Sequence, residues 1–293
     1  MKIGSVAWGW TPTPEDMPVG DSLERIADEI KALGFDIVDY LSDCDSLDQY
    51  FSAETAARIG NYCRSIGLDV GGLVFQSGAW NETDEAAKEK QLIYFEKCAQ
   101  TAQAMGAPNI SCIIPGPHGA KPNRAGSPSE KKASNLPKGY SWQKDWDNYI
   151  AQMTAACDIA AKYGRRIALE CFPGSLCATP HAMLQALKDI GRKNFGIQMD
   201  TAHLMNQHID IETTVYMLGA DNIFNVHAKD SDGMGRGNLP CGTGLVDYTA
   251  VIRALRDVGY AGNISIEVEF TDNPRRYMKQ AIEHLRQCLD GTY

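Results

Sequence analysis

Residues 166–200 of the chain read RIALECFPGSLCATPHAMLQALKDIGRKNFGIQMD. Short apolar runs open and close this stretch, at residues 166–169 and 195–199. Between them, apolar residues recur at helical spacing and stop at Gly191, which fits the left-handed turn that ends many helices. A strand, a helix and a second strand in this order predict a β-α-β unit with parallel strands.

The same unit repeats from one end of the chain to the other. Apolar runs predict eight strands, at residues 3–7, 36–40, 69–75, 109–114, 166–169, 195–199, 223–226 and 264–266. The segments between them have helical spacing, and a last helix is expected to start at Asn273 and Pro274. Eight successive strand–helix units predict an α/β fold, a (β/α)8 TIM barrel that forms a single domain over residues 1–293.

One segment interrupts this pattern. Residues 115–146 contain several prolines, glycines, serines and lysines without apolar spacing, so they predict a long loop after the fourth strand. Loops of this length in compact domains are usually lids or binding loops, and a disordered surface insertion is the alternative. Trp142 and Trp146 indicate that the end of this segment packs against the domain.

Composition narrows the range of partners. The chain has 293 residues, 44% of them apolar and 22% charged, which is typical of a globular protein with a large core. The net charge of −9 disfavours nucleic acid as a partner. No apolar run is long enough to span a membrane, and the N-terminus lacks the pattern of a secretory leader, so we expect a cytoplasmic protein. The nine scattered cysteines do not predict a disulfide framework.

Polar residues capable of binding a metal follow each of the last four predicted strands. They are Glu170, Asp200, His227 and Glu267. All strand ends of a parallel barrel open on one face, where the catalytic residues of TIM barrels lie. The four side chains are therefore expected to converge, although any one of them alone is more often a helix cap or an ion-pair partner.

Three carboxylates and one imidazole at close range favour a bound cation. Without one, the carboxylates would repel one another and raise one another's pKa values. The mostly oxygen ligand set suits a single divalent ion, with Mn²⁺ favoured and Mg²⁺, Co²⁺ or Zn²⁺ as alternatives.

Further polar residues are expected at the same face. His203 follows Asp200 closely enough to meet a substrate hydroxyl, and Lys229 is placed to hold a substrate oxygen or phosphate. The alternative for Lys229 and the adjacent Asp230 is a surface ion pair. His118 lies in the turn after the fourth strand and is a candidate to line the cleft, while Glu269 is a rival to Glu267 as ligand.

Several motifs together resemble the sugar phosphate isomerase/epimerase superfamily, the xylose-isomerase-like TIM barrels. They are LECFPG at 169–174, MDTAHL at 199–204, VHAKDSD at 226–232, CGTGLVDY at 241–248, GYAGNISIEVE at 259–269 and EIKALGFDIVDY at 29–40. The resemblance implies a single metal held by the four strand-end residues, with His203 near the metal or on the substrate. By similarity to ketose 3-epimerases, it also implies that Glu170 and Glu267 carry protons on opposite faces of the substrate.

The chain departs from ketose 3-epimerases after the histidine of the seventh strand. Those enzymes have an arginine a few residues later, whereas this chain has Ala228, Lys229 and Asp230, which is more similar to inosose dehydratases. Arg236 is a candidate substitute for that arginine. The resemblance thus implies a divalent-metal-dependent isomerase or epimerase acting on a sugar, keto-sugar or cyclitol through an enediolate, with a metal-dependent dehydratase or lyase as the alternative.

Two other classes share the predicted barrel. An endonuclease IV-like phosphodiesterase needs a three-zinc cluster and a basic face, which six histidines and a charge of −9 disfavour. A non-catalytic sugar-binding subunit is also conceivable, because a fold does not by itself imply activity. We expect a small-molecule substrate, no nucleic acid or membrane partner, and possible assembly into a homo-oligomer.

Overall fold

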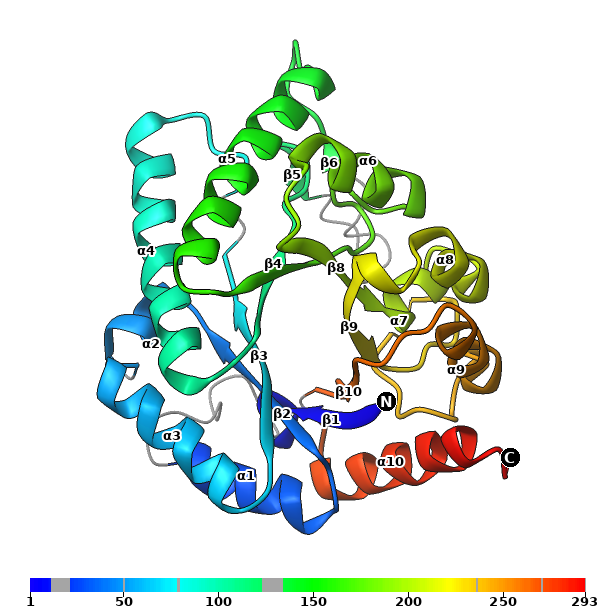
Figure 1. Ribbon diagram of the computed structural model, residues 1–293. Coiled ribbons are helices and arrows are strands. Elements are labelled where there is room, and N and C mark those ends of the chain that lie inside the picture. Colours follow the sequence, from blue (N-terminus) through cyan, green and yellow to red (C-terminus); the bar gives the residue numbers. More distant parts are fainter. Residues whose placement is uncertain are drawn as a thin grey trace.

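A closed barrel of eight parallel strands forms the centre of the protein (Figure 1). The computed structural model describes residues 1–11, 22–49, 51–77, 80–122, 134–235, 237–269 and 271–292. The barrel strands, in chain order, are β1 (Lys2–Val6), β2 (Ile37–Ser42), β3 (Asp69–Phe75), β4 (Asn109–Ile113), β7 (Arg166–Glu170), β8 (Phe195–Asp200), β9 (Ile223–Ala228) and β10 (Asn263–Ile266). All eight predicted strands are present, and β1 closes the barrel by pairing with both β2 and β10. The predicted TIM barrel is confirmed.

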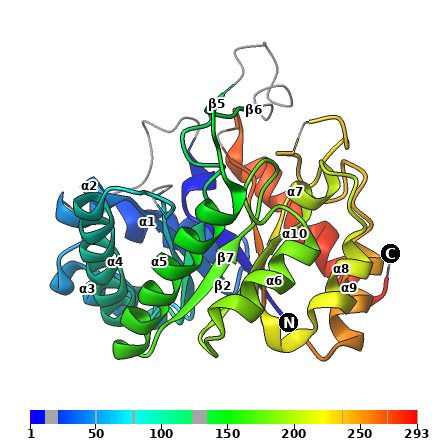
Figure 2. The same ribbon diagram turned by 90° about the horizontal axis from the view of Figure 1, so that it is seen from above.

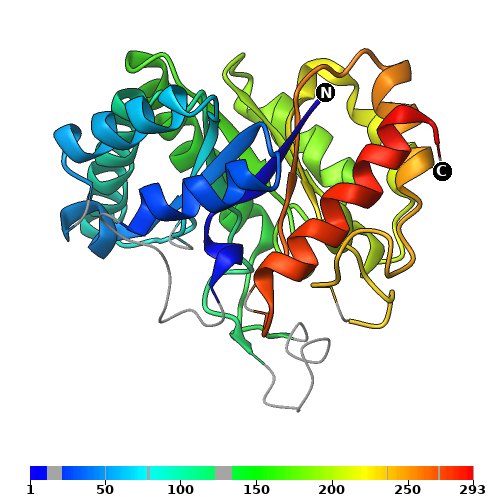
Figure 3. The same cartoon turned by 90° about the horizontal axis from the view of Figure 1, so that it is seen from below.

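Helices surround the barrel and alternate with its strands (Figures 1 and 3). They are α1 (Ser22–Ala32), α2 (Cys44–Gln49), α3 (Ala53–Ser65), α4 (Glu85–Met105), α5 (Trp142–Lys162), α6 (Pro180–Ile190), α7 (Thr201–Met205), α8 (Ile211–Leu218), α9 (Tyr248–Asp257) and α10 (Pro274–Asp290). In the part of the chain that the structure describes, no helix has the length and apolar character needed to cross a membrane. All nine cysteines are free thiols, as expected.

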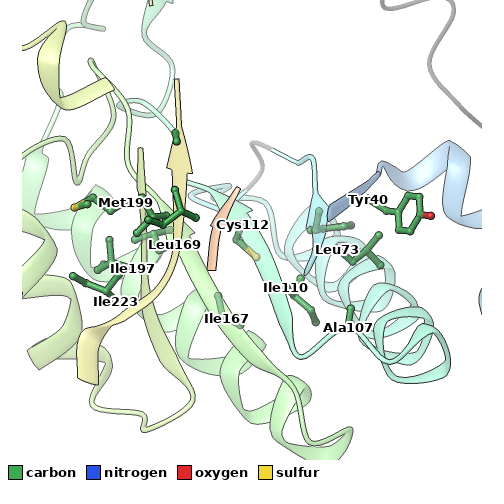
Figure 4. Close-up of a cluster of buried hydrophobic side chains, with 14 of the residues drawn as sticks. Tyr40, Leu73, Ala107, Ile110, Cys112, Ile167, Leu169, Ile197, Met199 and Ile223 are labelled. Carbon is green, nitrogen blue, oxygen red and sulfur yellow. The ribbon is translucent and has the colours of Figure 1, made fainter. Parts of the chain in front are cut away.

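Alternate residues of each strand face different surroundings. On β2, the Tyr40 hydroxyl lies 3.4 Å from the carbonyl oxygen of Leu23 on α1 and 3.3 Å from the sulfur of Cys63 on α3, so Tyr40 points outward to the helices. The buried apolar side chains drawn in Figure 4 belong to this core between barrel and helices. This burial of apolar surface is the main source of the barrel's stability.

The interior of the barrel is polar below the strand ends. Gln198 on β8 accepts hydrogen bonds from the Ser111 hydroxyl of β4 and, at 3.2 Å, from the side-chain amide of Asn225 on β9. The side-chain nitrogen of Gln198 lies 3.2 Å from Nδ1 of His227. All four side chains are buried. Strand polar residues therefore support the histidine from below, in a network that orients its ring.

Asp39 on β2 is a buried carboxyl group inside the same barrel. Burial raises its pKa above the ordinary value of 3.8, against the opposing attraction of His227. A carboxyl whose pKa is raised by folding reduces stability as the pH rises above the unfolded pKa, because its charged form is disfavoured only in the folded state.

We therefore expect Asp39→Asn to unfold at the same or a higher temperature than the parent protein at pH 7. The difference should shrink as the pH falls below 3.8, where the carboxyl becomes protonated in both states. Thermal unfolding across this pH range checks the expectation. Asp69→Asn is the matched control, because Asp69 is exposed and pairs with Lys2. A large fall in unfolding temperature for Asp39→Asn at pH 7 would contradict the assignment.

The predicted loop after the fourth strand ends earlier than the sequence suggested. Helix α5 begins at Trp142, where the side chain of Ser141 accepts a hydrogen bond from the backbone NH of Lys144. The boundary at Trp146 was wrong, because apolar spacing is weak in this first turn. Trp146 is buried, stacks on Trp142 at 5.2 Å and donates to Asp189 of α6, so the expected packing is confirmed.

Inside this loop, two short strands pair antiparallel: β5 (Lys121–Pro122) and β6 (Ser134–Asn135). Figure 2 shows this pair projecting beyond one end of the barrel.

A buried carboxylate fixes the base of the same loop. Oδ2 of Asp145 accepts hydrogen bonds from the backbone NH of His118, at 2.7 Å, and from the hydroxyl of Tyr140, at 3.0 Å. Its Oδ1 accepts from the side-chain amide of Asn81, at 3.0 Å. Asp145 lies in the first turn of α5, so one side chain joins the start of the loop, its end and the neighbouring connection after β3.

Candidate metal centre

The four strand-end residues lie together at the mouth of the barrel. Glu170 and Asp200 end β7 and β8, His227 lies in β9, and Glu267 follows β10. These strands are neighbours in the barrel, in the order β10, β9, β8, β7. Each residue offers one ligand atom, and the four atoms lie within 4.8 Å of one another. All four residues are buried, so the structure brings together the set that the sequence predicted.

Lys229 belongs to the same cluster. Its Nζ lies 2.8 Å from Oε2 of Glu267 and 3.1 Å from Oδ2 of Asp200. Nδ1 of His227 lies 3.0 Å from Oε2 of Glu267 and 3.6 Å from Oε1 of Glu170. The Lys229 side chain is only 6% exposed, so the alternative of a surface ion pair is wrong for this residue.

The charges of these groups support one another. Burial and Glu267 oppose ionisation of Glu170, but the His227 ring and Lys229 outweigh them, and its pKa is lowered. Burial is likewise outweighed at Glu267, where Lys229 and His227 hold the pKa well below its ordinary range. The carboxylates raise the pKa values of His227 and Lys229 against the effect of burial. Burial raises the pKa of Asp200 despite His203 and Lys229.

The donor set fits one divalent metal ion. The group that could hold a metal consists of three carboxylates and one imidazole, so a bound dication would neutralise most of the negative charge of these four residues. Among the described residues, Oδ2 of Asp200 is buried and accepts no hydrogen bond of normal geometry. The ammonium group of Lys229 lies 3.1 Å away as an ion-pair partner, and a bound metal ion would supply the direct ligand contact that this oxygen lacks. Carboxylate oxygens with one imidazole suit Mn²⁺, Mg²⁺, Co²⁺ or Zn²⁺.

His203 lies beside the cluster, in α7. Its Nε2 is 3.8 Å from Oε1 of Glu170 and also 3.8 Å from Oδ2 of Asp200. Its backbone NH donates to Oδ1 of Asp200, which makes Asp200 the N-cap of α7. The capping role considered from the sequence is thus real for Asp200, and it fixes the carboxylate beside the other ligands. Burial lowers the pKa of His203, so a neutral ring faces the site.

Glu269 was considered as a rival to Glu267. Among the described residues, the group with the geometry to hold a metal contains Glu267 and not Glu269. Oε1 of Glu269 instead accepts a hydrogen bond from Nε1 of Trp8, at 2.6 Å. Burial, with the nearby charge of Glu267, raises the pKa of Glu269 to about 7.

Two other candidates are placed less directly. The contact that fixes His118 is the hydrogen bond from its backbone NH to Asp145. Its role on the substrate stays a prediction. Arg236 lies outside the described residues.

Asp230 organises the loop between β9 and α9. Its Oδ1 accepts hydrogen bonds from the backbone NH groups of Ser231 and Val246, and its Oδ2 accepts from that of Gly242, all at 2.9 Å. Asp230 is fully buried, so the idea of a surface ion pair is wrong for it as well. The sequence hid this role because the donors are backbone groups up to 16 residues away.

We expect Asp230→Asn to lower the free energy of unfolding by about 2–3 kcal/mol, because hydrogen bonds to a charged acceptor contribute roughly 1.5–3 kcal/mol each. In this variant the side-chain NH₂ group replaces one of the two carboxylate oxygens. It then faces backbone NH groups, which are donors as well, so their hydrogen bonds to residue 230 are lost. Chemical denaturation measures the loss, and faster amide exchange at Gly242 and Val246 locates it. Asp247→Asn is the control, since the exposed Asp247 caps α9 and Asn caps equally well. Equal stability of the two variants would contradict this role.

Sequence reasoning missed the residues beneath the ligands. Gln198, Asn225 and Ser265 each stand two positions before a ligand on the same strand. Because side chains on a strand alternate, these residues point into the barrel as the ligands do. That spacing was the available signal. Trp8, whose ring centroid is 6.3 Å from that of His227, had no comparable signal.

The sequence of this chain is similar to one protein-family model and to several known proteins. The model of the family described as xylose isomerase-like TIM barrel matches residues 27–288. The chain is 23% identical to an L-ribulose 3-epimerase of Mesorhizobium japonicum, over 91% of this chain and 80% of that protein. It is 24% identical to an inosose isomerase of Halalkalibacterium halodurans, over 88% of this chain and 86% of that protein.

One further relative matches a shorter segment of the chain, and one solved structure matches the whole chain. The chain is 33% identical to protein MJ1311 of Methanocaldococcus jannaschii, over 42% of this chain and 46% of that protein. The crystal structure of the IolI protein with a bound zinc atom superposes with a TM-score of 0.76 at 18% identity, covering 100% of this chain and 99% of that one. Likeness at this identity shows a shared fold.

Proposed function

The chain belongs to the xylose isomerase-like TIM barrel family, and on this basis we propose that it is a divalent-metal-dependent isomerase or epimerase of a sugar, keto-sugar or cyclitol. The epimerase and isomerase named among its relatives support the sugar isomerase or epimerase class. The observation that carries the proposal is the convergence of Glu170, Asp200, His227 and Glu267 within 4.8 Å at the barrel mouth.

Glu170 and Glu267 are the proposed proton carriers. Both are buried, both are held ionised by His227 and Lys229, and they reach the cluster from β7 and β10, with two strands between them. A bound metal would polarise a ketone oxygen and the neighbouring hydroxyl, which would acidify the C–H of the carbon that bears this hydroxyl. One carboxylate then removes the proton, an enediolate of the substrate forms, and the other carboxylate returns the proton from the opposite face.

Neighbouring residues are proposed to bind the substrate. The neutral ring of His203, 3.8 Å from Glu170 and Asp200, is placed to hydrogen-bond a sugar hydroxyl. The ammonium group of Lys229 is proposed to face a substrate oxygen, and His118 and Arg236 are proposed as further substrate-binding residues. We propose Mn²⁺ as the preferred ion, because oxygen ligands predominate; the zinc atom in the IolI protein supports Zn²⁺ as an alternative.

Incubation with a panel of keto-sugars and inososes in deuterated water with MnCl₂ tests the reaction. Isomerisation or epimerisation with deuterium at the reacting carbon is expected, since a solvent-exchanged carboxylate returns the proton. A dehydrated product instead would support the lyase alternative, which the Lys229–Asp230 pair after His227 favours by resemblance. Absence of both reactions across the panel, in protein shown to contain metal, would contradict the proposal.

A further inference from the structure

The ammonium group of Lys229 occupies a position that conflicts with a bound metal ion. Its Nζ contacts Oε2 of Glu267 and Oδ2 of Asp200, at 2.8 and 3.1 Å. Both residues belong to the metal-binding group. A metal ion about 2.1 Å from the same Glu267 oxygen would therefore lie within about 5 Å of the ammonium, and closer if it also bound the Asp200 oxygen.

Two cations at this separation repel each other strongly in a buried site. Little solvent screens them, because the side chains of Lys229, Asp200 and Glu267 are no more than 7% exposed. Screening by water and salt acts mainly on exposed charges. Lys229 and a divalent ion are thus alternatives for the same negative charge.

Hydrogen bonds hold the backbone of Lys229 in place, so only its side chain can move away from the carboxylates. Its backbone NH donates to the hydroxyl of Thr201 at 3.2 Å, and its carbonyl oxygen accepts from that hydroxyl at 2.7 Å. The next residue, Asp230, is held by three backbone hydrogen bonds. A lysine side chain has four rotatable bonds, which allow its ammonium group to leave the carboxylates without any change in the loop.

We propose that Lys229 is a built-in competitor of the metal ion: its ammonium group neutralises Asp200 and Glu267 until a divalent ion displaces it. This inference rests on the metal site of the proposed function. It adds two consequences: the protein stays folded when no metal is bound, and the affinity for metal is lower than the four ligands alone would give. Displacement also frees the ammonium group for the substrate.

The test compares Lys229→Met, which keeps an unbranched side chain of nearly the same length and removes its charge, with the parent protein. Both are prepared with MnCl₂ and then stripped with a chelator. Calorimetric titration of the stripped proteins with MnCl₂ should give at least a tenfold lower Kd for Lys229→Met, since a cation next to the ion is gone.

Thermal unfolding supplies a second readout. In chelator, Lys229→Met should unfold about 5 °C or more below the parent, because buried carboxylates lose their partner. In saturating MnCl₂ the two should agree within about 2 °C. Lys229→Arg, which keeps the charge, should recover most of the loss in chelator. Lys2→Met is the matched control. It removes a lysine from an exposed ion pair at the start of β1, at the end of the barrel opposite the cluster, and should change neither Kd nor stability.

Several results would overturn the inference. An unchanged Kd for Lys229→Met would do so, and so would an equal loss of stability with and without MnCl₂, which would make Lys229 purely structural. If Lys229→Met does not fold, Lys229→Gln is measured in its place under the same criteria. Failure of the proposed function is distinguishable, because it is measured by the sugar panel, whereas this inference is measured by Mn²⁺ affinity and thermal unfolding. A parent protein that binds no Mn²⁺ would contradict the metal site on which both rest.

Discussion

Glu267→Gln is expected to lower kcat at least about 10³-fold while the barrel remains folded. A positioned proton carrier contributes roughly 10²–10⁴-fold to the rate, and the amide of glutamine carries no proton between carbons. The same change removes one of the three carboxylates that face the metal. The side chain keeps its size, and Lys229 and His227 remain as hydrogen-bond partners, so circular dichroism and thermal unfolding should show a folded protein.

Glu269→Gln is the matched control for this change. Glu269 lies two residues later, in contact with Trp8 and outside the metal-binding group of the described residues. We expect Glu269→Gln to keep stoichiometric metal and to lose activity far less than Glu267→Gln. An active Glu267→Gln variant combined with an inactive Glu269→Gln variant would reverse the assignment of the two residues.

Removal of the metal is expected to abolish activity and to lower the unfolding temperature. A ligand that binds only the folded protein stabilises it by about 2.7 kcal/mol at a concentration of 100 times its Kd, which is roughly 5–10 °C for a chain of this size. Dialysis against chelator followed by reconstitution measures both effects. Mn²⁺ should restore the highest activity, with Mg²⁺, Co²⁺ and Zn²⁺ compared in parallel.

His227→Ala provides the control for metal removal. It deletes the only imidazole of the ligand set and leaves all three carboxylates in place. Its unfolding temperature should rise much less when metal is added than that of the parent protein. Activity that persists after complete removal of bound metal would contradict the metal-dependent assignment. Elemental analysis of the protein verifies that the metal has been removed.

The fold was predictable because its pattern is local and repeated. Each strand is a short apolar run such as residues 195–199, and each helix between strands is bounded by a cap or a glycine, so errors at one boundary do not affect the others. The start of α5 was misplaced because its first turn contains Trp142, Gln143 and Lys144 without an apolar stripe. There the helix depends on capping by Ser141 and on tertiary packing of the tryptophans.

The convergence of the four candidate ligands was predictable because, in a parallel barrel, residues at the ends of neighbouring strands lie close together in space. Glu170, Asp200, His227 and Glu267 stand at equivalent points of successive strands, and parallel strands bring such points together. The burial of Lys229 between Asp200 and Glu267 was not predictable, since it depends on side-chain direction. The hydrogen bonds by which Asp230 holds the loop between β9 and α9 were not predictable either, because the donors are backbone NH groups, which do not depend on residue type.

The carboxylate of Asp145 fixes both ends of the segment between His118 and Tyr140. It accepts hydrogen bonds from His118 and Tyr140, near the start and the end of the segment between β4 and α5, and from Asn81 in the connection after β3. We therefore expect His118 and Tyr140 to keep their places when the residues between them are exchanged for a loop of different length. Asp145 is thus the residue to retain when this segment is redesigned.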